Sequence, residues 1–414
     1  MNKRVVIIGG GFGGLNCAKA LKKAHLDLLL IDKHNHHLFQ PLLYQVASAA
    51  LSPANIATSL REIFAHQKNM TVIMGTVERI DKTNRIVVLL NGTSIPYDYL
   101  VIAVGAHHSY FGHDEWEALA PGLKTISDAL TIRERLLIAF EKAERMDDEK
   151  EREKHLQFVV IGGGPTGVEM AGAIAEIAHQ TMVKNFRKIR PEKSKIYLIE
   201  GASRILPSFP DALSNRAQKD LEKMGVQVII GKTVTNITEE GVQIGPDFIF
   251  SKSVIWAAGN QGCSLLKTLD IPLDRQGRAH VQNDLSIENH PEIFIIGDAA
   301  CTLGKNQAPL PAVAPVAIQQ GRYVAHIIRN HIAKEKRDPF KYFDKGSLAT
   351  IGKNKAVGFF RKIYFKGIFA WMIWGFVHIA YLVNYRSRFL VMFNWILQYL
   401  TGMRGARLIR KSID

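Results

Sequence analysis

The sequence predicts an α/β protein made of two similar parts, each a parallel sheet with helices packed against it. A glycine-rich turn between an apolar strand and a helix occurs twice, at residues 9–14 and 162–167. Each turn is followed by a second apolar strand that ends in an acid, Asp32 in the first part and Glu200 in the second. Strands that alternate with helices are typical of parallel sheets, so the repeat predicts two domains of one fold class.

The first glycine-rich turn has the spacing of a dinucleotide-binding, or Rossmann, fingerprint. Residues 9–14 read Gly-Gly-Gly-Phe-Gly-Gly and fit G-x-G-x-x-G, directly after the strand 5–8 and before a helix that contains Ala18. Glycines are needed because a Cβ would block the tight turn and the approach of a pyrophosphate to the helix N-terminus. The strand 28–31 ends in Asp32, where the carboxylate can accept the ribose hydroxyls.

The second fingerprint occupies residues 162–167, Gly-Gly-Gly-Pro-Thr-Gly, between an apolar strand and a helix that contains Ala171. Its second strand, 196–199, ends in Glu200, whose carboxylate would repel a 2′-phosphate and so favours NADH over NADPH. The longer spacing before this acid predicts a helix extended by the basic stretch 184–195, which we interpret as a solvated face.

Three further apolar segments end in small residues, at 100–105, 254–259 and 293–298. Each one alone is explained as well by a buried strand that is followed by a turn glycine. Their order along the chain, combined with the two fingerprints, supports two dinucleotide-binding domains.

Composition and charge narrow the class of protein. A chain of 414 residues, 47% hydrophobic and 22% charged, exceeds the usual single domain and is typical of folded globular proteins. The net charge is +15, and residues 341–414 hold thirteen Lys or Arg against two acids. These cations are interleaved with Trp371, Trp374 and Trp395, a mixture that favours an anionic membrane surface over nucleic acid as the partner.

The C-terminal apolar segments predict an amphipathic helical region that anchors the chain peripherally. The stretch 367–385 has no formal charge over nineteen residues and is long enough to span a bilayer. It contains His378 and is followed at once by Arg386 and Arg388, so we favour an interfacial helix, with a transmembrane helix as the alternative. The N-terminus has no signal-peptide pattern, which predicts the cytoplasmic face of the inner (plasma) membrane.

Cysteine and histidine spacing predicts neither a metal site nor a redox disulfide. Cys17, Cys263 and Cys301 form no short-spaced pair, and we expect buried thiols. The fifteen histidines include no H-x-x-x-H or H-E-x-x-H pattern, so no metal is expected.

With these features the sequence resembles the two-dinucleotide-binding-domain flavoproteins of the pyridine nucleotide-disulfide oxidoreductase type. Within them it is most similar to the type II, non-proton-pumping NADH:quinone oxidoreductases. The narrower match lies in residues 36–47 (His-His-Leu-Phe-Gln-Pro-Leu-Leu-Tyr-Gln-Val-Ala), in the run Gly-Val-Glu169 at the end of the second fingerprint, and in residues 346–352 before the aromatic, basic C-terminus. The resemblance covers essentially the whole chain.

The resemblance implies a respiratory flavoenzyme with FAD at the first fingerprint and NADH at the second. A membrane quinone, ubiquinone or menaquinone, would accept the electrons. Asp298 would hydrogen-bond the ribityl chain of FAD, and Glu169 would orient the nicotinamide or relay a proton to the quinone. The alternative role for Glu169 is an acid that stabilises a helix N-terminus.

One departure from the family concerns the quinone. Family members often carry A-Q-x-A-x-Q near the flavin, whereas residues 314–319 read Ala-Pro-Val-Ala-Ile-Gln. Pro315 stands where the first glutamine would be, so only Gln319 remains as a second candidate catalytic residue beside Glu169. A helix-surface amide is the alternative role for Gln319.

The candidate cofactor contacts are those of the fingerprints and of the ends of the predicted strands, together with residues that the family resemblance implies. They are Gly9, Gly11, Phe12, Gly13, Gly14, Leu15, Asp32, Lys33, Pro41, Val77, Gly105, Gly297, Asp298, Ala314, Pro315, Gly162, Gly164, Thr166, Gly167, Glu200 and Gly259.

The expected domains are a discontinuous FAD domain, an NADH domain inserted in it, and a C-terminal region for membrane association and quinone access. Their expected bounds are 1–115 with 280–330, 116–279, and 340–414. The sequence leaves open whether the chain forms a homodimer.

Two rival functions stay open at this point. One is a sulfide:quinone oxidoreductase or another pyridine-nucleotide flavoprotein reductase, which would need paired cysteines beside the flavin. The other is an NADH-sensing, membrane-docking protein whose flavin site is inactive.

Overall fold

A computed structural model describes residues 2–304, 306–402 and 404–409, which divide into two compact units. Unit 1 comprises the residues up to 38, 57–107 and 260–344, and unit 2 comprises 39–56, 108–259 and the residues from 345 onward. These limits differ from the predicted domain bounds. The segment 39–56 and the C-terminal region belong to unit 2, because the helix Leu43–Ala47 and the strand Ser347–Gly352 both pack on the helix Pro165–Glu176.

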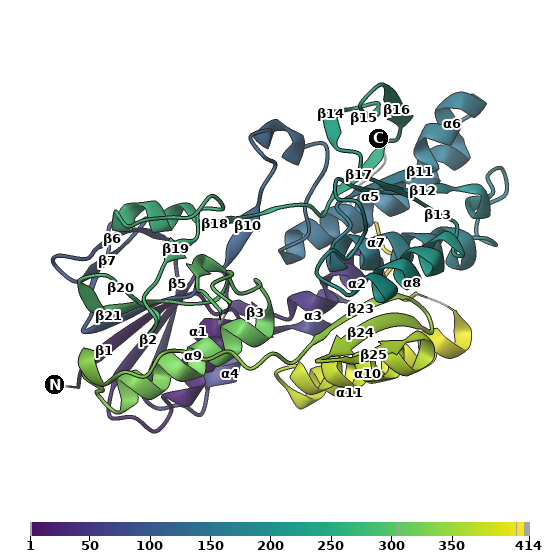
Figure 1. Ribbon diagram of the computed structural model, residues 1–414. Coiled ribbons are helices and arrows are strands. Elements are labelled where there is room, and N and C mark those ends of the chain that lie inside the picture. Colours follow the sequence, from purple (N-terminus) through teal and green to yellow (C-terminus); the bar gives the residue numbers. More distant parts are fainter. Residues whose placement is uncertain (1, 305, 403, 410–414) are drawn as a thin grey trace. The chain divides into compact units, whose positions relative to one another are not determined.

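Unit 1 is built on a six-stranded sheet with the strand order β20-β21-β9-β1-β2-β5 (Figure 1). All neighbours are parallel except β20 and β21, and the sheet core is formed by strand residues such as Val6, Leu29 and Ile293. The strands are β1 (Arg4–Ile8), β2 (Asp27–Asp32), β5 (Met70–Met74), β9 (Tyr99–Ile102), β20 (Ser286–Ile287) and β21 (His290–Ile295).

Two helices of unit 1, α1 (Phe12–Ala20) and α9 (Ala314–Arg329), lie side by side (Figure 1). Smaller elements complete the unit. They are β3 (His36–Leu38), β4 (Ala57–Ser59), α4 (Leu60–Phe64), β6 (Val77–Asp81), β7 (Ile86–Leu89), β8 (Ser94–Pro96), β18 (Asn260–Gly262), β19 (Ala279–His280), β22 (Ala300–Cys301) and the 3-10 turn Gly297–Ala299. The strand β10 (Ala106–His108) lies where the chain leaves unit 1.

Unit 2 contains the second parallel sheet, with the order β13-β12-β11-β17. Both sheets therefore have the predicted arrangement, a strand, a glycine turn, a helix and a second strand that ends in the acid. The elements are α2 (Leu43–Ala47), α3 (Pro53–Ile56), α5 (Ile126–Arg145), α6 (Glu149–His155), β11 (Gln157–Ile161), α7 (Pro165–Glu176), β12 (Lys195–Glu200), α8 (Asp211–Glu222), β13 (Val226–Ile230), β14 (Val234–Thr238), β15 (Gly241–Ile244), β16 (Asp247–Phe250) and β17 (Ser253–Trp256).

The predicted extension of the second fingerprint helix through residues 184–195 is wrong. α7 ends at Glu176, a π-helical turn covers Ile177–Thr181, and turns, bends and a short 3-10 helix (Pro191–Lys193) follow. The backbone can leave the helix here because the Glu144 carboxylate accepts the N–H groups of residues 187–189 at 2.8–3.1 Å. Those N–H groups therefore have partners outside a helix.

The C-terminal part of unit 2 is a three-stranded antiparallel sheet followed by two helices. Its elements are β23 (Ser347–Gly352), β24 (Lys355–Phe360), β25 (Ile363–Lys366), α10 (Gly367–Tyr381) and α11 (Tyr385–Thr401). β23 packs on α7, and α10 packs on β24 and on α11 (Figure 1). The apolar stretch 367–385 breaks after Tyr381 because the Asn384 side chain caps α11, accepting the N–H of Ser387 at 2.6 Å.

No helix within residues 2–304, 306–402 and 404–409 is both long and apolar enough to cross a membrane. Cys17 and Cys301 are buried as expected, whereas Cys263 is partly exposed, and all three are free thiols.

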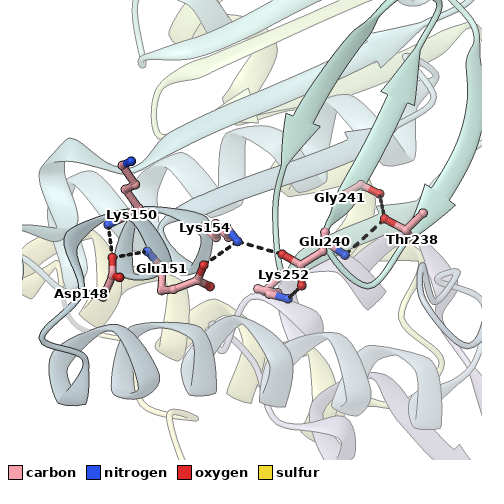
Figure 2. A network of polar contacts seen from close by, with 8 residues as sticks. All are labelled: Asp148, Lys150, Glu151, Lys154, Thr238, Glu240, Gly241 and Lys252. Carbon is pink, nitrogen blue, oxygen red and sulfur yellow. Dashed lines mark hydrogen bonds and ion pairs between the residues drawn. The ribbon is translucent and has the colours of Figure 1, made fainter.

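A surface network of charges joins α6 to the β14–β16 sheet in unit 2 (Figure 2). Lys154 donates to Glu151 at 2.6 Å and to Glu240 at 2.9 Å, and Lys252 donates to Glu240 as well. Both lysines lower the pKa of the Glu240 carboxyl, to about 2. The network is solvent-exposed, so we assign it a minor structural role.

Candidate functional site

The backbone of the glycine turn in unit 1 is packed so tightly that two of its positions have no room for a side chain. Gly9 has φ +102°, and a Cβ there would lie 2.3 Å from the Ala103 carbonyl oxygen. A Cβ at Gly14 would lie 1.9 Å from the oxygen of Gly9. Glycine is therefore required at both positions by the turn and by the packing of α1 on the strand.

Gly11 differs from these two glycines because it faces open space. A Cβ added there would meet no atom within 4 Å. Gly11 is also the N-cap of α1, and no side chain caps this helix. The first N–H groups of α1 therefore face an open position, which suits the pyrophosphate of a dinucleotide.

The acid at the end of β2 fixes the same turn. Asp32 accepts the N–H of Gly10 at 2.6 Å and the N–H of His34 at 2.7 Å. Each carboxylate oxygen has capacity for a further hydrogen bond, so both can still accept a ribose hydroxyl.

His37, to which the sequence assigned no role, holds the turn from the other side. Its Nδ1 lies 2.8 Å from the Gly10 carbonyl oxygen, and its ring stands edge-on to Phe12 with centroids 5.2 Å apart. A carbonyl oxygen can only accept, so Nδ1 carries the proton. Burial lowers the pKa of His37 to about 4, which keeps the ring neutral.

The start of α9 lies against this turn. Gln320 is 1% exposed, accepts the N–H of Gly297 at 2.6 Å and donates to the Thr302 hydroxyl at 2.9 Å. A Cβ at Gly13 would lie 3.0 Å from the Ile296 side chain, so the 3-10 turn that contains Asp298 is close to α1. Unit 1 thus brings Gly13, Gly297 and Asp298 close together, and their shared role in one cofactor site stays a prediction.

The side chain of Gln319 forms hydrogen bonds with the backbone in the structure. Its Nε2 donates to the Phe343 carbonyl at 2.9 Å, and its Oε1 accepts the Phe343 N–H at 3.0 Å. Pro315 occupies the first turn of α9, where its missing N–H costs no helix hydrogen bond. A catalytic role for Gln319 stays a prediction, and its ligand would have to compete with the Phe343 backbone.

Unit 2 repeats the turn of unit 1. Gly162 has φ +109°, and a Cβ at Gly167 would lie 1.8 Å from the Gly162 oxygen. Gly164, the N-cap of α7, has no side-chain cap and no atom within 4 Å of its Cβ position. Glu200 accepts the N–H of Gly163 at 2.5 Å and that of Ala202 at 2.7 Å. This second turn fits a second dinucleotide for the same reasons.

Glu169 lines a cavity of about 120 Å³ within unit 2. Withdrawal of the carboxyl group from water raises the pKa of Glu169 to about 8, although the N–H of Thr350 donates to it and opposes the shift. The side chain is therefore a neutral acid at neutral pH. The cavity wall combines α7, β23 and the C-terminal helices, which supply the aromatic residues Trp371, Trp374, Trp395 and Tyr399.

A chain of hydrogen bonds crosses one wall of this cavity. Trp395 Nε1 donates to Gln45 Oε1 at 2.7 Å, and Gln45 Nε2 donates to the Tyr44 hydroxyl at 2.9 Å. Burial raises the pKa of Tyr44 well above its usual value, and the nearby Glu169 adds to this effect. The Tyr44 hydroxyl is therefore protonated.

A buried ion pair ties the chain after α11 to this wall. Arg404, with 3% of its side chain exposed, donates to Glu176 at 2.7 Å and to the Ser48 carbonyl at 2.7 Å. The other Glu176 oxygen accepts the N–H of Lys353 at 2.5 Å. One carboxylate on α7 therefore connects the C-terminal sheet and the C-terminal tail.

Comparisons with known proteins identify the family of this chain. Residues 3–321 match the pyridine nucleotide-disulphide oxidoreductase model, and residues 345–404 match the NDH2 C-terminal domain. The chain is 44% identical to the type II NADH:quinone oxidoreductase NdhA of Mycobacterium tuberculosis, over 99% of this chain and 90% of the relative. The chain belongs to the type II NADH:quinone oxidoreductases.

Two further relatives of this type II chain extend the likeness. The type II NADH:quinone oxidoreductase Ndh of Mycobacterium tuberculosis is 43% identical, over 97% of this chain and 89% of the relative. The structure of NDH2 from Plasmodium falciparum in complex with NADH has a TM-score of 0.89 at 23% identity, over 98% of this chain and 99% of that chain. At this identity the second likeness concerns the fold.

The remaining predicted contacts occupy different parts of the type II chain. In unit 1, Leu15 is buried in α1, Lys33 is exposed after β2, Val77 begins β6, and Ala314 begins α9. Gly105 follows β9 with φ +70°. In unit 2, Pro41 lies in a 3-10 turn, Thr166 is exposed at the start of α7, and Gly259 follows β17 with φ +72°. Their cofactor contacts stay predictions.

Sequence reasoning assigned no role to several residues of the site. Tyr44 and Gln45 lie inside the family segment 36–47, so the resemblance located them without a function. Gln320 is adjacent to the predicted Gln319, and its helix position alone does not reveal the hydrogen bond to Gly297. No local signal indicates Arg404, because its partners Ser48 and Glu176 are distant in sequence.

Proposed function

We propose that this chain transfers a hydride from NADH to FAD and passes two electrons to a membrane quinone without pumping protons. The net reaction, NADH + H⁺ + quinone to NAD⁺ + quinol, conserves atoms and electrons. The observation that carries the proposal is the pair of open glycine turns, at Gly11 and Gly164, together with the neutral acid Glu169 in an aromatic cavity.

Unit 1 is the proposed FAD site. The flavin supplies two-electron chemistry that no side chain provides. The N-terminus of α1 would hold the pyrophosphate, Asp32 a ribose, and Asp298 the ribityl chain. His37 and Gln320 keep the turn and its neighbour in place through Gly10 and Gly297.

Unit 2 is the proposed NADH site. The N-terminus of α7 would hold the pyrophosphate in the same way. Glu200 already accepts two backbone N–H groups, so its negative charge is fixed at the edge of the sheet. A 2′-phosphate at this position would be repelled, which favours NADH over NADPH.

The cavity that contains Glu169 is the proposed place for the quinone head. Aromatic residues suit a flat apolar ring, and a neutral carboxylic acid can donate to a carbonyl oxygen. Because its pKa is raised to about 8, Glu169 can also release a proton near neutral pH.

The same two helices that wall the cavity carry the proposed membrane surface. Trp371 and Trp395 line the cavity, whereas other residues of α10 and α11, such as Phe376 (75% exposed) and Leu400 (74%), are open to solvent. Cations lie at the N-terminal ends of these helices, with Lys366 just before α10 and Arg388 in the first turn of α11. We propose that this face lies on anionic lipid at the cytoplasmic side of the membrane and admits quinone from the bilayer.

The primary test is steady-state oxidation of NADH by purified protein with a short-chain quinone. We expect a yellow protein that releases FAD on denaturation, reduces the quinone and strongly prefers NADH to NADPH. A protein that binds FAD and NADH but reduces no quinone would support the sensing alternative.

Light scattering on the same sample measures whether a homodimer forms.

A second test addresses Glu169. Glu169→Gln should retain FAD and its reduction by NADH but slow quinone turnover, while Glu222→Gln on the surface of α8 serves as the control. Since the folded pKa is raised, Glu169 contributes stability below its ordinary pKa that is lost as pH rises through about 8. The variant should lose this pH dependence. If Glu169→Gln and the unmodified protein reduce quinone at the same rate across that pH range, Glu169 only stabilises the N-terminus of its helix.

A further inference from the structure

We infer that the Tyr44 hydroxyl donates a hydrogen bond to a carbonyl oxygen of the quinone and so positions it. The direction of the hydrogen bonds on the cavity wall leaves the Tyr44 proton free for this role. The inference rests on the proposed function, because it assigns a residue to the quinone site of that function. Tyr44, Gln45 and Trp395 all line the same cavity as Glu169.

The direction of the chain follows from its first member. An indole Nε1–H can only donate, so the atom of Gln45 that lies 2.7 Å from Trp395 must be its carbonyl oxygen. The amide nitrogen of Gln45 then faces the Tyr44 hydroxyl at 2.9 Å and donates to it. The Tyr44 oxygen therefore acts as an acceptor in this contact, and its own proton remains to be donated elsewhere.

The surroundings make that proton available to a ligand. Within residues 2–304, 306–402 and 404–409, no hydrogen bond from the Tyr44 hydroxyl to a protein acceptor is found. Trp374, another wall residue that is 2% exposed, likewise has a buried Nε1–H without a partner. A buried donor without an acceptor costs free energy, so the cavity favours a ligand that brings acceptors.

A quinone head fits this requirement. Its two carbonyl oxygens accept hydrogen bonds, and it has no donor that would compete with Tyr44 or Glu169. Two neutral donors therefore face a ligand with two acceptors, while the rings of Trp371 and Trp395 offer apolar contact.

Two variants test the inference by opposite routes. Tyr44→Phe removes the hydroxyl and keeps the ring, so we expect the KM for a short-chain quinone to rise about two- to tenfold. Gln45→Leu keeps the hydroxyl but removes the amide that donates to it, so the Tyr44 proton is no longer directed into the cavity. We expect the same rise in KM from this variant.

The control and the readouts separate positioning from folding. Tyr110→Phe removes another buried hydroxyl, which donates to the Ala120 carbonyl at 2.9 Å outside this cavity, and should leave the quinone KM unchanged. Reduction of bound FAD by NADH and oxidation by ferricyanide should be the same in all variants. An unchanged quinone KM in Tyr44→Phe would overturn the inference. Failure of the unmodified protein with quinone, but not with ferricyanide, would instead overturn the proposed function.

Discussion

The two glycine turns share one local design, yet each is held in place by a different kind of neighbour. The Gly10 carbonyl of unit 1 accepts the His37 side chain at 2.8 Å, whereas the equivalent Gly163 carbonyl of unit 2 accepts the backbone N–H of Leu206 at 2.7 Å. The first turn therefore depends on a side chain that can be changed or protonated. The second depends on backbone, which every substitution except proline preserves.

The helices behind the two turns are also covered differently. In unit 1, α1 is covered by α9, and a Cβ at Gly321 would lie 2.3 Å from the Gly13 oxygen. In unit 2, α7 is covered by β23, and a Cβ at Gly172 would lie 1.8 Å from the Ile351 oxygen. One fingerprint thus supports two kinds of packing, and in unit 2 that packing joins the C-terminal sheet to the helix that carries Glu169.

The largest expected effect comes from adding a methyl group at the last glycine of each turn. Gly14→Ala places a Cβ 1.9 Å from Gly9, and Gly167→Ala places one 1.8 Å from Gly162, so each should lose roughly 1–3 kcal/mol or more of stability. The two variants should differ in function. Flavin content measured by absorbance should collapse in Gly14→Ala, whereas Gly167→Ala should keep its colour and no longer be reduced by NADH. Equal loss of flavin in both would show that the two turns are not independent.

The next prediction separates ligand binding from folding. A Cβ at Gly11 or at Gly164 meets no protein atom within 4 Å, so either alanine variant should melt close to the unmodified protein. A pyrophosphate on the helix N-terminus would meet the methyl group directly. We expect at least about tenfold weaker FAD binding in Gly11→Ala and a similar rise in the KM for NADH in Gly164→Ala. A drop in melting temperature without cofactor would contradict the open geometry.

A smaller effect is expected at the acid of unit 2. Glu200→Gln keeps the shape and removes the charge that would oppose a 2′-phosphate. The ratio of kcat/KM for NADH to that for NADPH should fall by about tenfold, equivalent to about 1.4 kcal/mol. Asp32→Asn, the matched change in unit 1, should leave this ratio untouched. A shifted ratio in Asp32→Asn would reverse the assignment of the two cofactors.

The smallest effect is expected from changing His37, the side chain that holds the turn of unit 1 and has no counterpart at the turn of unit 2 among the residues that the structure describes. His37→Ala removes the hydrogen bond to Gly10, worth about 0.5–1.5 kcal/mol, and should weaken FAD binding without changing the KM for NADH. Because the folded pKa is lowered to about 4, His37 contributes stability that is present above its ordinary pKa and is lost as pH falls toward 4. Flavin release on acidification between pH 6.5 and 4 should therefore be less steep in the variant, as measured by flavin fluorescence.

Much of the framework was readable from sequence because its signals are local. The glycine turns, the strands before them and the acids Asp32 and Glu200 are specified by a few neighbouring residues whose backbone geometry has few solutions. The helix extension through 184–195 was misjudged because hydrogen bonds from Glu144, far away in sequence, keep that segment out of a helix. The helix propensity of a segment contains no information about a hydrogen-bond partner that is distant in sequence.

The sequence by itself determined the two dinucleotide folds, the family and the aromatic, basic character of the C-terminus. Only the tertiary structure decided that residues 39–56 and the C-terminal helices form one cavity with Glu169, and that Trp395 fixes the direction of the Gln45 and Tyr44 hydrogen bonds. The reason is physical. Burial sets the pKa of Glu169, and hydrogen-bond direction depends on which donors face which acceptors; both arise from residues that meet only when the chain is folded.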